Sequence, residues 1–423
     1  MANILFYMSL LLIWIMLLYH MFLAQGGYLY YKRYRQEIST WDKNLRALPQ
    51  VPKISVFIPA HNEEMVIAQT LKAMVRLNYP KDRLEIILIC DNCSDRTKEI
   101  GESFVKDFPF LRVIETEEPL KGRGKASALN YGLQNSSGDI IAVYDADNTP
   151  EKDALWYLVM GLVNDDKAAA IVGKFRVINS KNTWLTHFIN IETICFQWMA
   201  QAGRWFWFGV ATIPGTNFAI RRNVIEQLGG WDINAMAEDT ELTIRVYDFG
   251  YYIRFFPAAI TWEQEPEVLR VWWKQRSRWA RGNQYVVLKF IRNIFSLRQK
   301  RIMFDIFYFF FTYFLFFFGV IMSNIIFVMN LIVDLNLSVG NIAIVLWIIA
   351  FLLFLTEVMI TLSIERNQLT WRNILFVLTM YFTYSQMWIV LIVHSLFLEM
   401  RRVLKKEDHK WYKTERFSVK GDK

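Results

Sequence analysis

Four apolar stretches, each long enough to cross a lipid bilayer, constrain the fold of this 423-residue chain more than any other feature. They cover residues 4–23, 306–333, 342–364 and 374–398, and about 20 apolar residues in a helix match the hydrocarbon thickness of a bilayer. No Lys or Arg precedes the first apolar run, which is longer than the core of a signal peptide, so we expect a retained anchor. The sequence thus predicts a membrane protein whose residues 30–300 form a separate, more polar block.

Basic residues beside these stretches predict the side of the membrane on which each linker lies. Lys32 and Arg33 follow the first stretch directly, which places the central block in the cytoplasm. The linker 334–341 has no basic residue, so we expect it outside the membrane. Arg366 and Arg372 indicate that the next linker is inside.

The C-terminal tail conflicts with this count of crossings. A fourth crossing would place the tail outside, although the tail is basic. Its first basic residues are Arg401, Arg402, Lys405, Lys406 and Lys410. Three arrangements remain open: an exported basic tail, one stretch that lies in the membrane plane or re-enters, or re-entry of the first block.

The net charge and the cysteine content argue against two classes of function, nucleic-acid binding and a zinc or redox site. The net charge of +8 could indicate a nucleic-acid partner, but the basic residues cluster beside apolar segments, where lipid headgroups explain them better. Cys90 and Cys93 form a C-x-x-C spacing, with Cys195 far away. A zinc site needs two further ligands at suitable spacing, and none lies nearby, so we expect reduced cytosolic thiols.

The central block alternates short β-branched runs with helical stretches, which indicates an α/β fold with a parallel sheet and crossover helices. Strands are predicted at 54–58, 84–89 and 139–144, and apolar residues at helical spacing follow the first. Ligands of open α/β sheets bind beyond the carboxyl ends of the strands. The residues expected at this rim are Asn62, Glu63, Asp91, Asp145 and Asp147.

A carboxylate pair and a glycine-containing loop indicate a phosphate-activated substrate. Asp145 and Asp147 are one residue apart after a buried strand, so they can hold Mg²⁺ or Mn²⁺ against phosphate oxygens. Asp-x-Asp alone is more often a solvated turn, and its position favours the metal site. The loop 121–130 carries Lys125 but lacks the spacing of a P-loop. A plain surface loop and a phosphate contact are equally compatible with its sequence.

Two later clusters add groups suited to sugar chemistry. Glu238 and Asp239 would fit the first turn of a helix, and an ionised Asp239 could also accept a proton from a hydroxyl. Gln275, Arg278 and Trp279 offer hydrogen bonds, a positive charge and an apolar ring face for a sugar. The aromatic segment 184–208 suits either a core helix or a helix in the headgroup layer.

These motifs, in this order, resemble the inverting family 2 glycosyltransferases of the GT-A fold, in particular the processive membrane synthases of cellulose, hyaluronan and poly-N-acetylglucosamine. The resemblance covers nearly the whole chain and rests on residues 59–64, 91, 121–130, 145–147, 238–239 and 275–279, followed by the apolar spans. It implies a Rossmann-like cytosolic catalytic domain that binds a UDP-sugar.

The resemblance also implies roles for individual residues. The donor would be bound by Asn62, Glu63, Asp91, Lys125, Asp145 and Arg278. The metal, Mg²⁺ or Mn²⁺, would be held by Asp145 and Asp147. Asp239 would be the catalytic base, and the acceptor would contact Glu238, Gln275 and Trp279.

The chain departs from the family pattern at two positions. Ala237 replaces the Thr that often precedes the acid pair, which keeps both carboxylates. The segment 214–217 stands where cellulose synthases carry a Phe-Cys-Gly-Ser type acceptor loop, which weakens a strict cellulose assignment. The chain ends soon after its last span, so we expect no cyclic di-GMP-binding β-barrel domain.

The sequence therefore predicts a multi-pass protein of the plasma membrane with a cytoplasmic catalytic domain. We expect an anchor at 1–30, a GT-A domain with interfacial helices at 31–300, a transmembrane region at 301–400 and a basic tail at 401–423. Its partners would be a UDP-sugar, a growing polysaccharide and membrane lipids, without nucleic acid; no pattern identifies an accessory subunit. We favour synthesis of poly-N-acetylglucosamine over synthesis of a β-glucan, whether cellulose or a mixed-linkage glucan. A non-processive lipid glycosyltransferase and a nucleotide-sugar-binding sensor or transporter remain alternatives.

Overall fold

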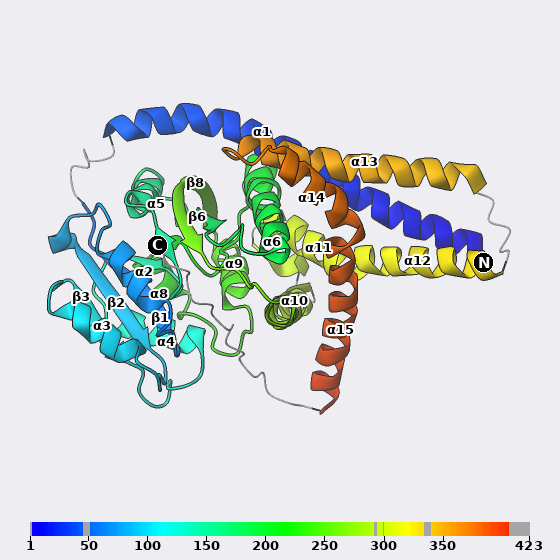
Figure 1. The fold of residues 1–423 in the computed structure, drawn as a ribbon. Helices are drawn as coiled ribbons and strands as arrows, with labels where there is room; N and C mark the ends of the chain where they lie inside the picture. Colours follow the sequence, from blue (N-terminus) through cyan, green and yellow to red (C-terminus); the bar gives the residue numbers. More distant parts are fainter. Residues whose placement is uncertain (1, 45–50, 292–293, 299, 334–339, 406–423) are drawn as a thin grey trace.

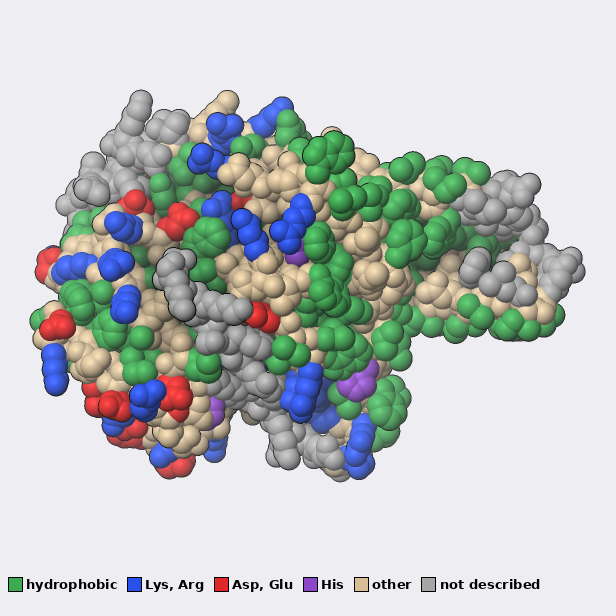
Figure 2. Space-filling model, viewed as in Figure 1, with side chains coloured by type: hydrophobic (Ala, Val, Ile, Leu, Met, Phe, Trp, Pro, Cys, Tyr) green, Lys and Arg blue, Asp and Glu red, His purple; other side chains and the backbone are tan. Residues whose placement is uncertain are grey.

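The computed structural model describes residues 2–44, 51–291, 294–298, 300–333 and 340–405. An α/β block lies at one end of the molecule, and an arm of long helices extends from it (Figure 1). Figure 2 shows that apolar side chains cover the arm, whereas charged side chains gather over the α/β block. The two parts therefore face different solvents, as the apolar stretches predict.

The block contains one eight-stranded sheet with the strand order β3-β2-β1-β4-β7-β6-β8-β5. The strands are β1 (Ile54–Ala60), β2 (Leu84–Cys90), β3 (Leu111–Glu115), β4 (Ile140–Val143), β5 (Thr149–Pro150), β6 (Ala168–Val177), β7 (Phe218–Arg221) and β8 (Tyr252–Glu263). The three predicted strands are confirmed as β1, β2 and β4. These strands and β3 are parallel, but β7 is antiparallel to both β4 and β6. The α/β fold with a parallel sheet is thus confirmed for β1 to β4, and the antiparallel β7 departs from it.

Helices cover both faces of the sheet and continue into the arm (Figure 1). In the block they are α2 (Ile67–Met74), η1 (Lys81–Arg83), α3 (Thr97–Val105), α4 (Lys125–Gln134), α5 (Ala154–Val163), α6 (Trp184–Cys195), η2 (Phe196–Gly203), α7 (Arg204–Phe208), α8 (Arg222–Gln227), α9 (Glu238–Asp248), α10 (Leu269–Ile291) and η3 (Ile294–Ser296). The others are α1 (Ala2–Asn44), α11 (Lys300–Phe310), η4 (Phe311–Phe316), α12 (Phe317–Ile332), α13 (Gly340–Ile364), α14 (Trp371–Phe382) and α15 (Tyr384–Lys405).

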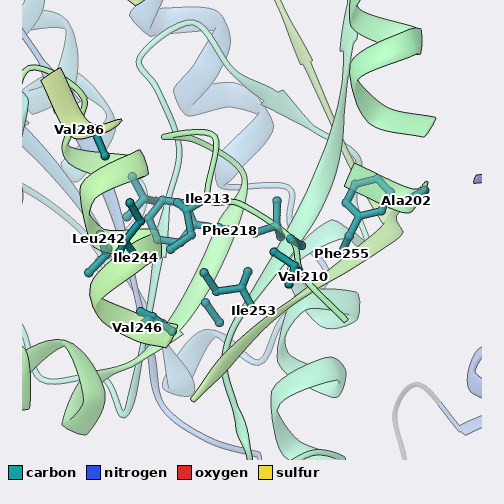
Figure 3. Close-up of a cluster of buried hydrophobic side chains, with 14 of the residues drawn as sticks. Ala202, Val210, Ile213, Phe218, Leu242, Ile244, Val246, Ile253, Phe255 and Val286 are labelled. Carbon is teal, nitrogen blue, oxygen red and sulfur yellow. The ribbon is translucent and has the colours of Figure 1, made fainter. Parts of the chain in front are cut away.

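The core on one face of the sheet lies between the strands and α9. Leu242, Ile244 and Val246 of α9 pack toward Phe218 of β7 and Ile253 of β8 (Figure 3). All five side chains are buried. Because burial of each such side chain stabilises the fold by roughly 1.5–3 kcal/mol, this packing fixes the position of α9, whose first turn carries Glu238 and Asp239.

Four helices within the described residues are long and apolar enough to cross a membrane: Asn3–Ile38, Lys300–Asn330, Val345–Ile364 and Trp371–Arg402. Helices α12 and α13 pack on α1 and form the arm with its N-terminal half. The C-terminal half of α1 instead runs along the block (Figure 1). There the Tyr30 hydroxyl donates to the carbonyl oxygen of Phe255 at 2.7 Å.

Buried charges join the end of the arm to the sheet. Glu365 follows α13, and its carboxylate lies 2.8 Å from the ammonium of Lys174 on β6. It also pairs with Arg176 and accepts a hydrogen bond of 2.9 Å from the Trp198 indole. Removing one partner from such a buried pair would leave an uncompensated charge. The end of the arm nearest the block is therefore held against β6 and η2.

The segment 184–208 is mainly a core element. Phe188 and Trp198 are buried, whereas Trp184 at the start of α6 is exposed. Helix η2 crosses α1 closely, because Gly27 and Gly203 leave no side chain between the two backbones. A Cβ on Gly27 would lie 1.9 Å from the Trp198 carbonyl oxygen, and one on Gly203 would lie 2.2 Å from that of Leu23. Small residues permit such close contact between helices.

We expect Gly27→Ala and Gly203→Ala each to destabilise the folded protein by about 1–3 kcal/mol, because the added methyl group forces two helices apart. The measurement is the temperature at which half of the detergent-solubilised protein loses its monodisperse size-exclusion peak. Leu18→Ala, on the exposed side of α1, is the control and should behave like the wild type. Unchanged thermal stability of both glycine variants would contradict this account of the helix crossing.

Candidate active site

A cavity of about 430 Å³ opens at the carboxyl ends of β1, β2 and β4. Ten of the eleven site residues predicted from the sequence line it. They are Glu63, Asp91, Lys125, Asp145, Asp147, Glu238, Asp239, Gln275, Arg278 and Trp279. The remaining residue, Asn62, lies in the adjoining turn and does not line the cavity. The structure therefore brings together side chains that are separated by more than 200 residues in the sequence.

Asp91 and Asn62 both hold loops at the rim. The Asp91 carboxylate accepts hydrogen bonds from the Thr116 hydroxyl at 2.7 Å and from the backbone N–H groups of Gly122 and Gly124 at 2.6 and 3.1 Å. Asn62 has a φ of 56°, and its side-chain oxygen accepts from the N–H of Ser94 at 2.7 Å. The glycine loop and the turn after β1 are thus fixed to the end of β2.

Lys125 lies at the centre of the charged part of the cavity. Its ammonium is 2.5 Å from the Asp145 carboxylate, 2.8 Å from the carbonyl oxygen of Gly215 and 3.9 Å from Glu238. Burial alone would lower the pKa of Lys125, but the carboxylates of Asp145 and Glu238 raise it above its ordinary value. The lysine is therefore positively charged, and it offsets the repulsion between these carboxylates.

The loop 214–217 shapes the floor around the acids. The Thr216 hydroxyl accepts the N–H of Asp145 at 3.0 Å and donates to the Asn148 side chain at 2.6 Å. Gly215 has a φ of 85°, and a Cβ there would lie 2.9 Å from the Asp239 carboxylate. A glycine is required at this position both for the backbone conformation and for this close approach.

The donor set around Asp145 and Asp147 fits a divalent metal that is shared with a ligand. Among the residues that the structure describes, no three His, Cys, Asp or Glu side chains form a complete metal site. Two carboxylates at a cavity wall leave the other coordination positions to phosphate oxygens and water, which is how Mg²⁺ is usually bound beside phosphates. Asp147 is positioned by the N–H of Gln264, which lies 3.4 Å from its carboxylate.

Glu238 and Asp239 begin helix α9, as predicted. Burial and the charge of Asp239 raise the pKa of Glu238 to about 7, although Lys125 and Arg278 oppose this rise. Burial also raises the pKa of Asp239 above its ordinary value, again against Lys125 and Arg278. Glu238 therefore changes its charge near neutral pH, and both buried acids hold a proton more firmly than exposed carboxyl groups do.

Glu241, in the same first turn, has a structural role. Its carboxylate pairs with Arg245 at 2.7 Å and with Lys289 at 3.0 Å. Glu241 therefore joins α9 to α10, and it is not among the residues that line the cavity.

Arg276 is a site residue that the sequence analysis missed. Its guanidinium donates to the Gln275 side chain at 2.8 Å and lies 3.9 Å from the centre of the Trp279 ring. It is held in turn by Glu192 at 3.0 Å and Glu265 at 3.5 Å. Arg276 is buried, so it fixes the direction of both neighbours on α10. The signal available in the sequence was the position of Arg276 between two predicted site residues, Gln275 and Arg278.

Glu263, at the end of β8, was also missed. Burial and the nearby carboxylates of Glu265, Asp147 and Asp145 raise the pKa of Glu263 well above its ordinary value. It lines the same cavity. The run Glu263-Gln264-Glu265 is visible in the sequence, but only the sheet brings it opposite Asp145 and Asp147.

The cavity continues from the charged rim toward the membrane helices. Its far end is lined by Tyr308, Phe309, Thr312 and Tyr313 from α11 and η4, and by Trp388 from α15. The four residues of α11 and η4 recur at helical spacing. An aromatic side chain of an apolar span, Phe309, thus lines the cavity wall.

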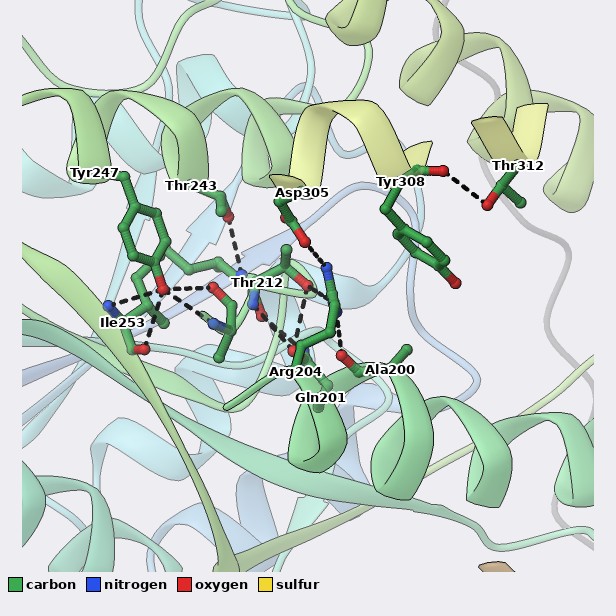
Figure 4. A network of polar contacts seen from close by, with 12 residues as sticks. Ala200, Gln201, Arg204, Thr212, Thr243, Tyr247, Ile253, Asp305, Tyr308 and Thr312 are labelled. Atoms are coloured by element: carbon green, nitrogen blue, oxygen red, sulfur yellow. Dashed lines mark hydrogen bonds and ion pairs between the residues drawn. The ribbon is translucent and has the colours of Figure 1, made fainter. Parts of the chain in front are cut away.

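A buried polar network supports this far end (Figure 4). Arg204 of α7 pairs with Asp305 of α11, and it donates to the Thr212 hydroxyl at 3.2 Å. The side-chain amide of Gln201 in η2 donates to the Thr212 carbonyl oxygen at 2.6 Å and accepts the Thr212 N–H at 3.0 Å. Arg204 and Asp305 are both buried, so this pair holds the start of the membrane helix on the catalytic block.

Comparisons with known proteins agree with the fold and with the family that the sequence resembles. The family model "Glycosyltransferase like family 2" matches residues 52–282. The chain is 66% identical to "Probable glycosyltransferase YdaM" of Bacillus subtilis over 418 residues, which is 99% of both chains. Among solved structures, the mannosyltransferase PcManGT from Pyrobaculum calidifontis, in complex with GDP-Man and Mn²⁺, superposes with a TM-score of 0.57. It is 20% identical, with 94% of this chain and 99% of that chain covered.

Polysaccharide synthases are also similar over part of their length. The chain is 31% identical to the poly-beta-1,6-N-acetyl-D-glucosamine synthase of Staphylococcus epidermidis over 240 residues, which is 57% of each protein. The corresponding Staphylococcus aureus synthase is 32% identical over 249 residues, 59% of this chain and 58% of that protein. The chain thus matches less than two thirds of the length of these synthases.

We expect Asp145→Asn and Asp147→Asn each to weaken Mn²⁺ binding in the presence of UDP by at least about tenfold. Loss of a group that only supports a metal ligand can already weaken metal binding by this factor. Loss of the free Mn²⁺ signal in electron paramagnetic resonance measures binding without turnover. Asp166→Asn, at a fully exposed carboxylate elsewhere in the block, is the control. Wild-type Mn²⁺ affinity in both site variants would exclude the proposed donor set.

Proposed function

The chain belongs to glycosyltransferase family 2, and we propose from this premise that it polymerises a UDP-sugar into a β-linked polysaccharide and passes the product into the membrane. The observation that carries the proposal is the continuous cavity. It runs from Asp145 at the sheet rim, past Trp279, to Tyr313 among the membrane helices. A single-sugar transfer needs only the rim, whereas a growing chain also needs the far end.

The rim suits a nucleotide-sugar donor. Asp145 and Asp147 would hold the divalent metal, which when bound neutralises charge on the diphosphate. Lys125 and Arg278 supply two further positive charges on the same side of the cavity. The diphosphate would replace carboxylates as the partner of Lys125, so the lysine changes from offsetting repulsion to stabilising the leaving group.

Asp239 is the proposed base. It would take the proton of an acceptor hydroxyl while that oxygen attacks the anomeric carbon from the face opposite the diphosphate. The bond from the anomeric carbon to the UDP oxygen breaks in the same step, and UDP leaves with the electron pair. One displacement inverts the anomeric configuration, so the product is β-linked. The Gly215 loop, in contact with Asp239, keeps this carboxylate beside the donor site.

Helix α10 provides the proposed acceptor site. The Trp279 ring is 40% exposed, and Arg276 fixes its orientation from one side. A sugar ring can stack on the apolar face of an indole. Gln275 and Glu238 would hydrogen-bond hydroxyl groups of the terminal sugar. The next sugars of the product would then lie along Tyr308 and Tyr313.

Relatives favour one sugar over the others. Two of the similar proteins are named as poly-beta-1,6-N-acetyl-D-glucosamine synthases, so we propose N-acetylglucosamine as the donor sugar and a poly-N-acetylglucosamine-like product. A β-glucan is the second choice. The catalytic block would lie in the cytoplasm, since Lys32 and Arg33 follow the first span.

We expect purified wild-type protein with UDP-N-acetylglucosamine and Mg²⁺ or Mn²⁺ to release UDP and form a high-mass product, and EDTA to stop both. UDP-glucose offered separately tests the β-glucan alternative. UDP release and product mass are measured, with Asp239→Asn as the matched variant that should lose at least about 10²-fold in rate. A single-sugar lipid product would exclude polymerisation. Donor binding without turnover would exclude the enzyme assignment altogether.

We expect kcat/KM to rise with pH through an inflection above the ordinary pKa of an aspartate, because burial raises the pKa of Asp239 and a protonated base cannot accept the hydroxyl proton. Glu238→Gln should move this inflection to lower pH, since one of the two buried carboxylates is removed. The measurement is the pH profile of UDP release at low donor concentration. An inflection that stays in place in the variant would show that the acid pair does not control the rate.

A further inference from the structure

The fourth apolar stretch is not one straight helix. It divides at Thr383 into α14 and α15. Helix α14 has 12 residues, which corresponds to a length of about 18 Å. A bilayer core is about 30 Å thick, so α14 alone cannot cross it. The charged tail left open whether the fourth apolar stretch crosses the membrane. The answer therefore depends on the course of α15.

Helix α15 packs along α10 of the catalytic block. The Tyr384 hydroxyl accepts a hydrogen bond of 3.0 Å from the Trp272 indole. One helical turn later the Trp388 ring lies 5.9 Å from that of Trp272. Farther along α15, the His394 ring lies 5.6 Å from the Trp273 ring.

The contact continues to the charged end of α15. Its Glu399 pairs with Arg281 of α10 at 3.4 Å. Helix α10 also carries Lys274 and Arg278 and contributes to the aqueous cavity. A helix that follows α10 over this length lies beside the block and outside the hydrocarbon core.

The opposite side of α14 and α15 is apolar and exposed. Its residues recur every three or four positions, as on one face of a helix. They are Trp371, Leu375, Leu378 and Phe382 in α14, and Val390, Val393, Phe397, Met400 and Leu404 in α15. Arg401 and Lys405 are exposed near the end of this row. The other side of α15 is buried against the protein through residues such as Leu391 and Glu399, so the exposed apolar face is the one left to meet lipid, as in an interfacial helix.

The apolar face is continuous with the membrane arm. Helix α14 contacts α13, and α15 contacts α12. Both run across the direction of the arm where it leaves the block (Figure 1), and apolar side chains cover this side of the base (Figure 2). Trp371 is 82% exposed at the start of α14, and Trp residues favour the headgroup level of a bilayer.

We propose that α14 and α15 lie along the cytoplasmic surface of the bilayer, with their apolar face in the headgroup layer and with Arg401 and Lys405 beside lipid phosphates. The chain then crosses the membrane three times, through α1, through α11 to α12, and through α13. The C-terminal tail stays on the side of the catalytic block, so the sequence count and the positive-inside rule agree. The proposal does not depend on the transfer reaction.

Cysteine labelling of the full-length protein tests the side of the tail. Ser418→Cys, Arg366→Cys and Val333→Cys are compared in right-side-out and inside-out vesicles with a membrane-impermeant maleimide, against the wild-type background. We expect Ser418→Cys to label in the same vesicles as Arg366→Cys and opposite to Val333→Cys. Labelling of Ser418→Cys together with Val333→Cys would establish a fourth crossing and overturn the proposal.

Depth measurements test the course of α15 directly. Nitroxides on cysteines introduced at Val390, Phe397 and Leu404 are probed with oxygen and a nickel chelate in phospholipid vesicles. We expect one shallow depth for all three, because the helix lies in the plane. A crossing helix would spread them over about 20 Å, and that gradient would overturn the proposal. Leu352→Cys, on the exposed side of α13, gives the deep reference.

Discussion

The buried contact of Glu365 with Lys174, Arg176 and Trp198 is the interaction on which the architecture depends. It joins the end of the long apolar helix α13 to an internal strand of the catalytic sheet. Charges of this kind are retained in an interior only when they are paired, so the two parts of the molecule can meet in one arrangement. The Arg204–Asp305 pair repeats this on the other side of the cavity. Between the two joints, the rim of the sheet faces the membrane helices at close range.

The electrostatics of the active site follow from this close packing, because it brings many charged groups to one cavity. Five carboxyl groups surround one cavity, namely Asp145, Asp147, Glu238, Asp239 and Glu263. Lys125 lies beside Asp145 and Glu238 and offsets only part of the repulsion among the five groups. Raised pKa values of the acids are the result. A bound divalent metal would add positive charge beside the acids, and the diphosphate would add negative charge beside Lys125. Donor binding would therefore also prepare the base.

Much of the fold could be predicted because its signals are local. A short β-branched run marked strand β1, residues at helical spacing marked the helix after it, and apolar stretches of bilayer length marked the arm. The antiparallel β7 could not be predicted, because Phe218–Arg221 is only four residues long and pairs with strands far away in the sequence. In the site, Asp145 and Trp279 carried recognisable motifs. Arg276 and Glu263 did not, since their importance lies in what they contact across the cavity.

The sequence by itself determined the chemistry of this protein: which side chains bear charge, which segments avoid water and which order of motifs the chain carries. These properties belong to residue types and to short spacings, so they are present before the chain folds. Only the tertiary structure decided that Phe309 and Tyr313 line a cavity, that Asn62 holds a loop and that α15 follows α10. Each of these depends on contacts between distant segments, and a helix with two apolar faces does not encode which face meets lipid and which meets protein.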